Sequence, residues 1–118
     1  MIPEELRQYS TLASALVVAV VSLNHRINGA VEQLKADMQL IDGSRLRVNE
    51  VYVGGQLRKY AYYRLTPTGE VLQGWDNAPH HPEITSYPHH VHQQDGVHPS
   101  QVRSLSDVFE LVAKLLQD

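Results

Sequence analysis

Residues 34–55 have the sequence LKADMQLIDGSRLRVNEVYVGG, in which apolar and polar side chains alternate on both sides of an Asp-Gly pair. Alternation with a period of two is typical of a strand that buries one face. Asp42-Gly43 is a strong hairpin signal, because glycine tolerates the positive φ that a tight turn demands. This stretch therefore predicts two antiparallel strands, 34–40 and 45–53, followed by a second turn at Gly54-Gly55.

Further strands are predicted on both sides of this hairpin. Residues 57–66 and 70–76 are separated by the turn sequence Pro67-Thr68-Gly69. Ahead of the hairpin, residues 16–27 are rich in valine, whose branched side chain prefers a pleated surface. We predict a largely buried strand there, and an N-terminal helix that continues through the valines is the alternative. Connected in chain order, these segments form a meandering antiparallel sheet of four to five strands.

A helix is predicted at each end of the chain. Pro3 suits the first turn of a helix, and apolar side chains recur at helical spacing up to residue 13, so the first helix covers roughly 3–13. Ser104 is a good N-cap residue for a second, amphipathic helix over roughly 105–117. The predicted fold class is α+β, with the sheet and both helices in a single domain that spans residues 1–118.

The composition excludes several kinds of site. The chain has 118 residues, no cysteine and a net charge of −3 when histidine is neutral. Without cysteine there is no disulfide framework, Cys-ligated zinc, iron–sulfur cluster or thiol nucleophile. The charge balance argues against a permanently basic surface for nucleic acid.

The N-terminal third of the sequence bears on location. Its longest apolar stretch, 12–23, has twelve residues, whereas a helix that spans a bilayer needs about 20. Glu4 and Glu5 stand where a signal peptide carries basic residues. We expect a cytoplasmic protein that makes no contact with a membrane.

Histidine is concentrated in one segment of the chain. Six of the seven histidines lie between residues 80 and 98, and two Pro-His-His copies begin at Pro79 and Pro88. No helical or strand period is visible over 77–103, where prolines interrupt the backbone hydrogen bonds. An irregular connection of this length is uncommon in a compact domain and is usually functional or disordered.

Paired histidines suit acid–base cleavage of RNA without a metal. One imidazole takes the proton of a ribose 2′-hydroxyl and another gives a proton to the leaving 5′-oxygen, because the pKa of histidine is close to neutral pH. The charge on the phosphate also needs a cation, for which strand 57–66 offers Arg58, Lys59 and Arg64. The tyrosines of this strand, Tyr60, Tyr62 and Tyr63, are expected to pack in the core, and stacking on RNA bases is the alternative.

Metal binding is a different interpretation of the same segment. His90 and His92 project from the same face of an extended segment, so both rings can bind one divalent transition metal such as Zn²⁺. The candidates for a third ligand are Asp95, His98, His80 and His81. A further alternative is a non-catalytic module in which the Pro/His-rich loop 77–99 docks a partner protein.

One motif resembles a known family. Residues 74–83 are GWDNAPHHPE, and a second run, Tyr87-Pro88-His89-His90 with His92 beyond it, follows. Together with the Asp42-Gly43-Ser44 hairpin, the segment 59–63 and the closing helix, this pattern resembles the TumE-type proteins, small bacterial toxins that are paired with helix-turn-helix antitoxins. The resemblance covers roughly residues 40–116. Val91 replaces an expected basic residue, and the stretch before Asp37 has no counterpart that we can match.

The resemblance implies a toxin of a bacterial toxin–antitoxin system and a helix-turn-helix antitoxin as its partner. From the histidines we infer that the target is RNA. We assign the acid–base group to three histidines with two more in support, namely His81, His90 and His92, and His80 and His89. Asp76 is expected to orient an imidazole through its carboxylate, and Arg64 to hold phosphate. The valine-rich segment 16–23 is expected to form a sheet edge, through which two copies pair as a homodimer. The alternative is that a strand or helix of the antitoxin covers the same surface.

Overall fold

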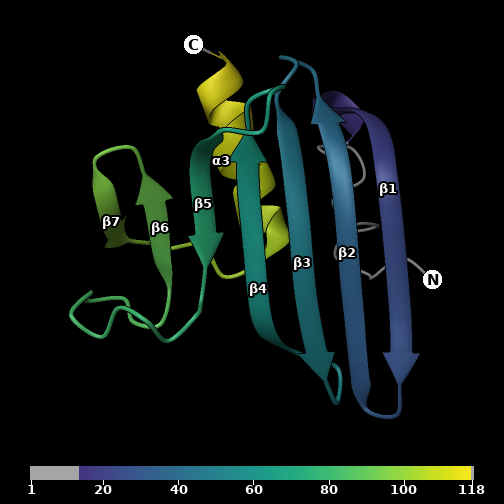
Figure 1. Cartoon of the computed structure of the whole chain (residues 1–118), viewed down its shortest axis with the longest axis vertical. Helices are drawn as coiled ribbons and strands as arrows, with labels where there is room; N and C mark the ends of the chain where they lie inside the picture. Colours follow the sequence, from purple (N-terminus) through teal and green to yellow (C-terminus); the bar gives the residue numbers. More distant parts are fainter. Residues whose placement is uncertain (1–13, 118) are drawn as a thin grey trace.

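The computed structural model describes residues 14–117, which form one antiparallel sheet and a C-terminal helix (Figure 1). Residues 14–16 are helical and lead directly into the first strand. In chain order the elements that follow are β1 (Val17–Asn28), β2 (Val31–Leu40), β3 (Arg45–Val53), β4 (Gln56–Leu65), β5 (Val71–Asp76), β6 (His90–Gln93), β7 (Gly96–Pro99) and α3 (Leu105–Gln117). The expected helix over 3–13 lies outside the described residues.

The sheet is a meander in which each strand pairs with its neighbour in the sequence. The turn between β2 and β3 is the predicted one: Gly43 has a φ of 86°, and the Leu40 N–H donates to the Ser44 carbonyl at 2.8 Å. The Asp42 carboxylate stabilises this turn by accepting hydrogen bonds from the Ser44 amide at 3.1 Å and the Ser44 hydroxyl at 2.5 Å. The register that follows places alternate residues of β2 and β3 on one buried face.

The predicted fold class is wrong in the size of the sheet and in the balance of elements. Among residues 14–117 the sheet has seven strands rather than four or five, and strands account for 53% of residues against 15% in helices. The two additional strands, β6 and β7, lie inside the segment 77–103 that the sequence predicts to be irregular. They escape detection because each has four residues, too few to show a period. The proline in β7 also misleads, because Pro99 lies on the outermost strand, where proline is tolerated.

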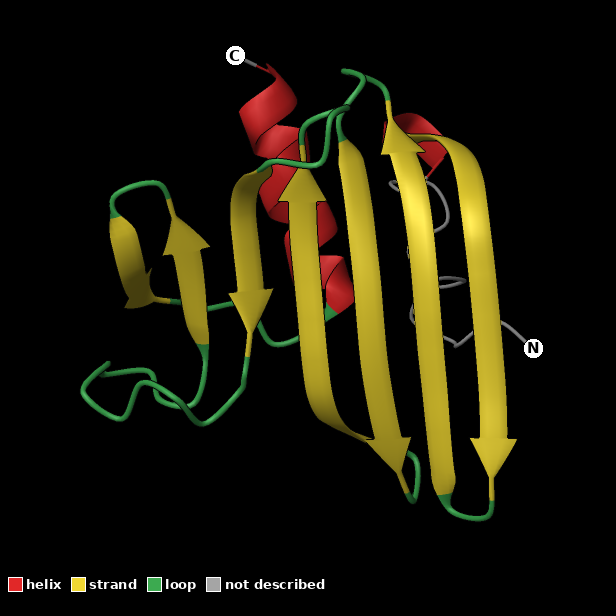
Figure 2. Ribbon diagram, in the orientation of Figure 1, coloured by secondary structure: helices red, strands yellow, loops and turns green. Residues whose placement is uncertain are grey.

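The C-terminal helix was predicted correctly and covers one face of the sheet (Figure 2). Val108, Phe109 and Val112 of α3 are almost fully buried and belong to the core. On the sheet, the core includes Leu34, Met38, Leu46, Val48, Tyr60, Tyr62 and Trp75. No described element covers the opposite face, which we call the open face (Figure 2).

β1 forms one edge of the sheet, as expected, but it is not the buried strand that the sequence predicts. Val18, Val20 and Ile27 expose 62%, 56% and 64% of their surface. Among residues 16–28, Leu16 belongs to the buried core and Val17 packs against it. The valines favour a strand in this segment. Burial of the strand depends on whether another element packs against it, and β-propensity carries no information about that packing.

The helices of residues 14–117 are short. α3 has 13 residues, and no helix in the described range is long and apolar enough to cross a membrane. The expected cytoplasmic location stays a prediction.

Candidate functional site

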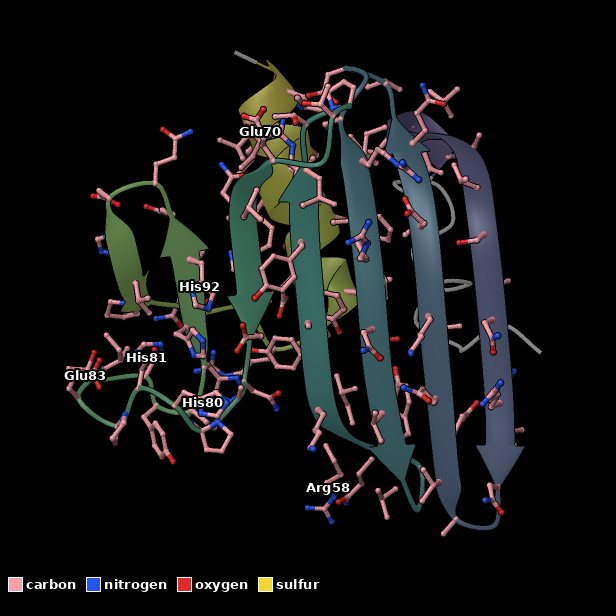
Figure 3. The ribbon with its side chains drawn as sticks, in the orientation of Figure 1. Arg58, Glu70, His80, His81, Glu83 and His92 are labelled. Atoms are coloured by element: carbon pink, nitrogen blue, oxygen red, sulfur yellow. The ribbon has the colours of Figure 1, made fainter. Side chains whose placement is uncertain are left out.

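The open face carries a cluster of histidines around one carboxylate. Asp76 ends β5 and pairs with His90 of β6, and Gly74 pairs with His92. Because residues two apart on a strand project to the same face, the side chains of Asp76, His90 and His92 meet there. We call these three residues the Asp-His-His cluster. Figure 3 labels His92 on β6.

The polar atoms of the Asp-His-His cluster are in direct contact. His90 Nε2 lies 2.8 Å from Oδ1 of Asp76, and His92 Nε2 lies 3.2 Å from Oδ2. The two Nε2 atoms are 3.1 Å apart. The side chain of His90 is 2% exposed and that of His92 is 34% exposed, so solvent and a substrate reach His92 but not His90.

His90 is oriented through its second ring nitrogen. Nδ1 lies 2.9 Å from the Pro88 carbonyl oxygen, which can only accept a hydrogen bond, so Nδ1 carries the hydrogen. Nε2 of His90 then faces the Asp76 carboxylate oxygen at 2.8 Å. Because both atoms carry lone pairs, this contact requires a hydrogen atom or a metal ion between them.

Asp76 is held in place by two donors outside the cluster. The Ala78 N–H donates to Oδ1 at 3.0 Å, and the Tyr63 hydroxyl donates to Oδ2 at 2.9 Å. Burial, together with the negative charge of Asp76, raises the pKa of Tyr63 to about 12, so the phenol keeps its proton and acts as the donor. Each carboxylate oxygen retains lone-pair capacity for an imidazole.

Gly74 makes room for the tyrosine that reaches Asp76. Tyr63 pairs with Gly74 across β4 and β5, and a Cβ atom at Gly74 would lie 2.2 Å from the tyrosine ring. The same ring stacks on His92 with centroids 6.2 Å apart. The absence of a side chain at residue 74 therefore allows Tyr63 to contact both Asp76 and His92.

His81 approaches the cluster from the loop that follows β5. Its ring centroid lies 5.1 Å from that of His90 and 6.0 Å from that of His92 (Figure 3). Its Nδ1 lies 3.2 Å from Oε2 of Glu83. A backbone hydrogen bond and the His81 imidazole hold the pKa of the Glu83 carboxyl below its usual range, so the carboxylate is available as an acceptor. The structure thus brings together four of the predicted residues: Asp76, His81, His90 and His92.

His80 and His89 do not join this group. His80 is exposed. His89 projects to the core face, where its Nδ1 lies 2.7 Å from the Tyr60 hydroxyl and that hydroxyl donates to the Val102 carbonyl. Burial, with the positive charges of Arg103 and His90, lowers the pKa of His89. These contacts make His89 a packing residue between β4 and the segment before α3.

Arg64 is also placed away from the cluster. Its guanidinium donates to Asp42 Oδ2 at 2.7 Å and to Gln73 Oε1 at 3.2 Å. Arg64 pairs with Gln73 in the register, one residue from Tyr63, and therefore projects from the face opposite to Tyr63. The structure shows it as a residue that ties β4 to the β2–β3 turn.

The third metal ligands considered from the sequence also lie elsewhere. His98 and Asp95 contact each other at 2.7 Å at the β6–β7 turn. The carboxylate that completes the trio is instead Asp76, from the neighbouring strand.

A groove of about 740 Å³ opens on the same face beside Asp76. Its walls include Lys59 of β4 and, from the loop after β5, His80 and Tyr87. Arg58, labelled at the start of β4 in Figure 3, adds a second cation. The groove therefore places positive charge and an exposed aromatic ring beside Asp76, while His81, His90 and His92 are not among the residues that line it.

Sequence reasoning missed three supporting residues, Tyr63, Asn77 and Glu83. The Asn77 amide accepts from the Tyr60 N–H and donates to the Arg58 carbonyl, both at 3.0 Å, and so fixes the loop to β4. The one available signal was position in the motif, since Asn77 and Glu83 both belong to the run of residues 74–83. Tyr63 also belongs to this pattern, in segment 59–63, but it was expected to pack in the core, and its contact with Asp76 on the open face follows only from the register of β4 and β5.

The family model described as Toxin TumE matches residues 8–118. The chain belongs to the TumE toxin family. The match starts well before Asp37, so the statement that this earlier stretch has no counterpart is wrong. Membership of the family supports a toxin role in a toxin–antitoxin system and implies an antitoxin partner. Comparisons with curated proteins and with solved structures found no match.

Proposed function

We propose that this toxin cleaves RNA, with His81 and His92 as a general acid–base pair. The observation that carries the proposal is the placement of these two half-exposed imidazoles, whose centroids are 6.0 Å apart on the open face. Each ring also contacts a carboxylate, Glu83 for His81 and Asp76 for His92. A carboxylate on one nitrogen orients the ring and leaves the other nitrogen for proton transfer.

The reacting nitrogens follow from these contacts. His81 uses Nδ1 to contact Glu83, which leaves Nε2 for the substrate, and His92 uses Nε2 to contact Asp76, which leaves Nδ1. Among the described residues, neither of these two nitrogens has a hydrogen-bond partner.

The reaction divides two proton transfers between the pair. One imidazole in its neutral form takes the proton of the ribose 2′-hydroxyl while the 2′-oxygen forms a bond to phosphorus. The bond from phosphorus to the 5′-oxygen breaks, and the second imidazole, in its protonated form, gives that oxygen a proton. The products are a 2′,3′-cyclic phosphate and a 5′-hydroxyl. No metal enters this scheme.

His90 has a positioning role in this proposal. Its buried ring does not reach substrate, but it lies against both Asp76 and His92 and is held by the Pro88 carbonyl. It therefore determines where the carboxylate and the His92 ring are placed. The sequence predicts an acid–base group of three histidines, and the proposal keeps two of them, His81 and His92.

The groove beside Asp76 is the proposed path of the RNA strand. Lys59 and Arg58 provide the cations that phosphate requires, the function expected of Arg64 from the sequence. Tyr87 is 45% exposed and lines the groove, where an unpaired base can stack on it.

The test is cleavage of a labelled single-stranded oligoribonucleotide in the presence of EDTA. We expect the wild type to cut this RNA and to leave the all-deoxy version intact, because the attacking 2′-hydroxyl is then missing. His81→Ala and His92→Ala should each lower the rate by about 100-fold or more, the usual contribution of a general acid or base. His98→Ala, outside the cluster and groove, is the matched control and should cut at the wild-type rate.

The same variants test the toxin role in cells. Expression of the wild type should arrest growth, and His81→Ala and His92→Ala should not. Equal toxicity of the double variant would reject the acid–base mechanism, and growth arrest without RNA cleavage would favour a loop that docks a partner protein.

The fold of the antitoxin partner is also part of the proposal. We infer that the antitoxin is a helix-turn-helix protein, encoded beside the toxin. Co-expression with that protein should restore growth, and co-purification should yield a stable complex. Restoration by a neighbouring protein of another fold would contradict this assignment.

A further inference from the structure

We propose that the Asp-His-His cluster is a binding site for one divalent transition-metal ion, with Zn²⁺ as its representative. The ligand atoms are Nε2 of His90, Nε2 of His92 and a carboxylate oxygen of Asp76, which all lie within 4.8 Å of one another. Two imidazoles and one carboxylate with an open fourth position form a donor set that zinc uses in proteins.

The spacing of the three ligand atoms suits a tetrahedral ion. Ligands at bond lengths of about 2.0–2.1 Å around such an ion lie about 3.3 Å from one another. The two Nε2 atoms are 3.1 Å apart, His90 Nε2 lies 2.8 Å from Oδ1 of Asp76, and His92 Nε2 lies 3.2 Å from the other carboxylate oxygen, Oδ2. With one ligand atom from each residue the set lies within 4.8 Å, so small rotations of the carboxylate and the imidazoles bring the three atoms to tetrahedral spacing.

Hydrogen bonds from outside the Asp-His-His cluster orient its side chains as they would be oriented around a metal ion. The Pro88 carbonyl fixes the hydrogen of His90 on Nδ1, which directs the Nε2 lone pair toward Asp76. The Ala78 amide and the Tyr63 hydroxyl hold the carboxylate from outside and leave its inner lone pairs for the ion. A metal ion between Nε2 of His90 and Oδ1 of Asp76 would also bind the lone pairs that face each other across this 2.8 Å contact.

Three protein ligands leave the fourth position to water. The side chain of His92 is 34% exposed, so one side of the cluster faces solvent and provides an entry path. His81 lies beside this opening but is not a member of the group whose ligand atoms converge. Metal binding should therefore depend on His90 and His92 but not on His81.

A bound metal would regulate the activity proposed above, and this part of the inference rests on that proposed function. When the ion takes Nε2 of His92, the single ring hydrogen must reside on Nδ1. The metal-bound ring can then neither accept a proton at Nδ1 nor become the imidazolium that donates one, so His92 can serve neither as the base nor as the acid. The metal-loaded protein is accordingly the inactive form, and the metal-free protein is the active one.

Binding is tested first and without reference to activity. The full chain, purified without a metal-affinity column and treated with EDTA that is then removed, is titrated with ZnCl₂ by calorimetry and native mass spectrometry. We expect one Zn²⁺ per chain. His92→Ala and His90→Ala should weaken binding by about 100-fold or more, since loss of an outer-shell partner alone costs about 10–100-fold.

Two variants make the binding result specific. His81→Ala and His98→Ala should bind Zn²⁺ as the wild type does. Circular dichroism must show that His92→Ala, which alters a half-exposed side chain, retains the wild-type fold. No saturable binding by the wild type, or equal weakening by His98→Ala, would overturn the site.

RNA cleavage with and without Zn²⁺ separates this inference from the proposed function. Activity in EDTA that falls at least 10-fold with one equivalent of Zn²⁺ supports both. Activity in EDTA without zinc binding rejects the metal site and leaves the function standing. Zinc binding without any cleavage rejects the function and keeps the site, and cleavage only after Zn²⁺ is added rejects the inhibitory role.

Discussion

Asp76 is the residue on which most contacts of the site converge. Its two oxygens receive the Ala78 amide and the Tyr63 hydroxyl and also contact the imidazoles of His90 and His92. A carboxylate can satisfy four such contacts because each oxygen has two lone pairs. Asp76 can therefore act as a general orienting group for the cluster, whether a proton or a metal ion lies between its members.

Gly74 provides a test of how Tyr63 is placed. In Gly74→Ala the new methyl group meets the tyrosine ring, so we expect Tyr63 to move away from Asp76 and His92. Overpacking of this kind costs about 1–3 kcal/mol, and RNA cleavage should fall as the cluster loosens. Urea denaturation and the cleavage assay measure the two effects.

A double-mutant cycle gives the control for this prediction. If the clash with Tyr63 is the cause, then Gly74→Ala should cost little in a Tyr63→Ala background. Additive losses of stability in the double variant would show that the methyl group acts on something other than the tyrosine.

Asp42 predicts a pH dependence of stability away from the site. Burial alone would raise the pKa of Asp42, but hydrogen bonds from Ser44 and Arg64 outweigh it and hold the pKa below its usual range. A depressed pKa in the folded state means that this stabilisation is present above the unfolded pKa. It is lost as the pH falls through the folded value.

Asp42→Asn should therefore be less stable than the wild type at pH 7 by about 1 kcal/mol, near the upper end for partly exposed ion pairs. The difference should be smaller at about pH 3, below the ordinary Asp pKa of about 3.9, than at pH 7, because the carboxylate of the unfolded chain is protonated first. Urea denaturation at both pH values measures it. A difference that is constant with pH would contradict the assigned cause.

At the scale of elements, the exposure of β1, which the sequence predicts to be buried, leads to a stability prediction. Val20 is 56% exposed on an edge strand, so Val20→Lys should change the free energy of unfolding by less than about 0.5 kcal/mol. Val48, which is 1% exposed on β3, is the matched position, and Val48→Lys should prevent folding. Severe destabilisation by Val20→Lys would show that β1 is covered in solution.

The same edge carries the proposal of a homodimer. An exposed valine-rich strand with unpaired backbone groups can pair with a second copy, and a lysine there opposes such pairing. Sedimentation velocity should show the wild type self-associating more strongly than Val20→Lys. A monomeric wild type over the accessible concentration range would reject the homodimer.

The elements show which parts of the fold were predictable from sequence. Asp42-Gly43 specifies its turn locally, and the apolar stripe of residues 105–117 specifies its helix, so both were predicted correctly. β6 and β7 are stabilised by pairing with β5 and with each other rather than by local propensity. Their four-residue sequences therefore carried no signal.

The candidate site was predictable to a similar extent. His90 and His92 were paired correctly from their spacing, and Asp76 was named as an orienting group. The geometry of the site depends on the β5–β6 register, which places Asp76 rather than Asp95 beside His90 and His92. Arg64 illustrates the limit, because only the structure shows that Asp42 already binds its guanidinium.

For the whole molecule, stability should depend on the contact between α3 and the covered face of the sheet. Phe109 is 1% exposed in this core, so Phe109→Ala should cost about 3–5 kcal/mol of unfolding free energy. Leu115 lies on the same helix but is 47% exposed, and Leu115→Ala should change stability little. Similar losses for the two variants would contradict the assigned packing face of α3.

The hydrophobic core and the candidate functional site lie on opposite faces of the sheet. One face of the sheet is covered by α3 and carries the core (Figure 2), whereas the open face carries the groove and the histidines His81, His90 and His92. The proposed acid–base pair, the carboxylates that contact it and the proposed metal ligands all lie on or beside β5 and β6.

The chemical identity of the RNA ends tests the central claim most directly. Mass spectrometry of fragments produced by the EDTA-treated wild type should find 2′,3′-cyclic phosphate and 5′-hydroxyl ends, because in the proposed mechanism His81 and His92 catalyse attack by the neighbouring 2′-hydroxyl. Fragments with 3′-hydroxyl and 5′-phosphate ends, or the same fragments from the His81→Ala/His92→Ala variant, would contradict it.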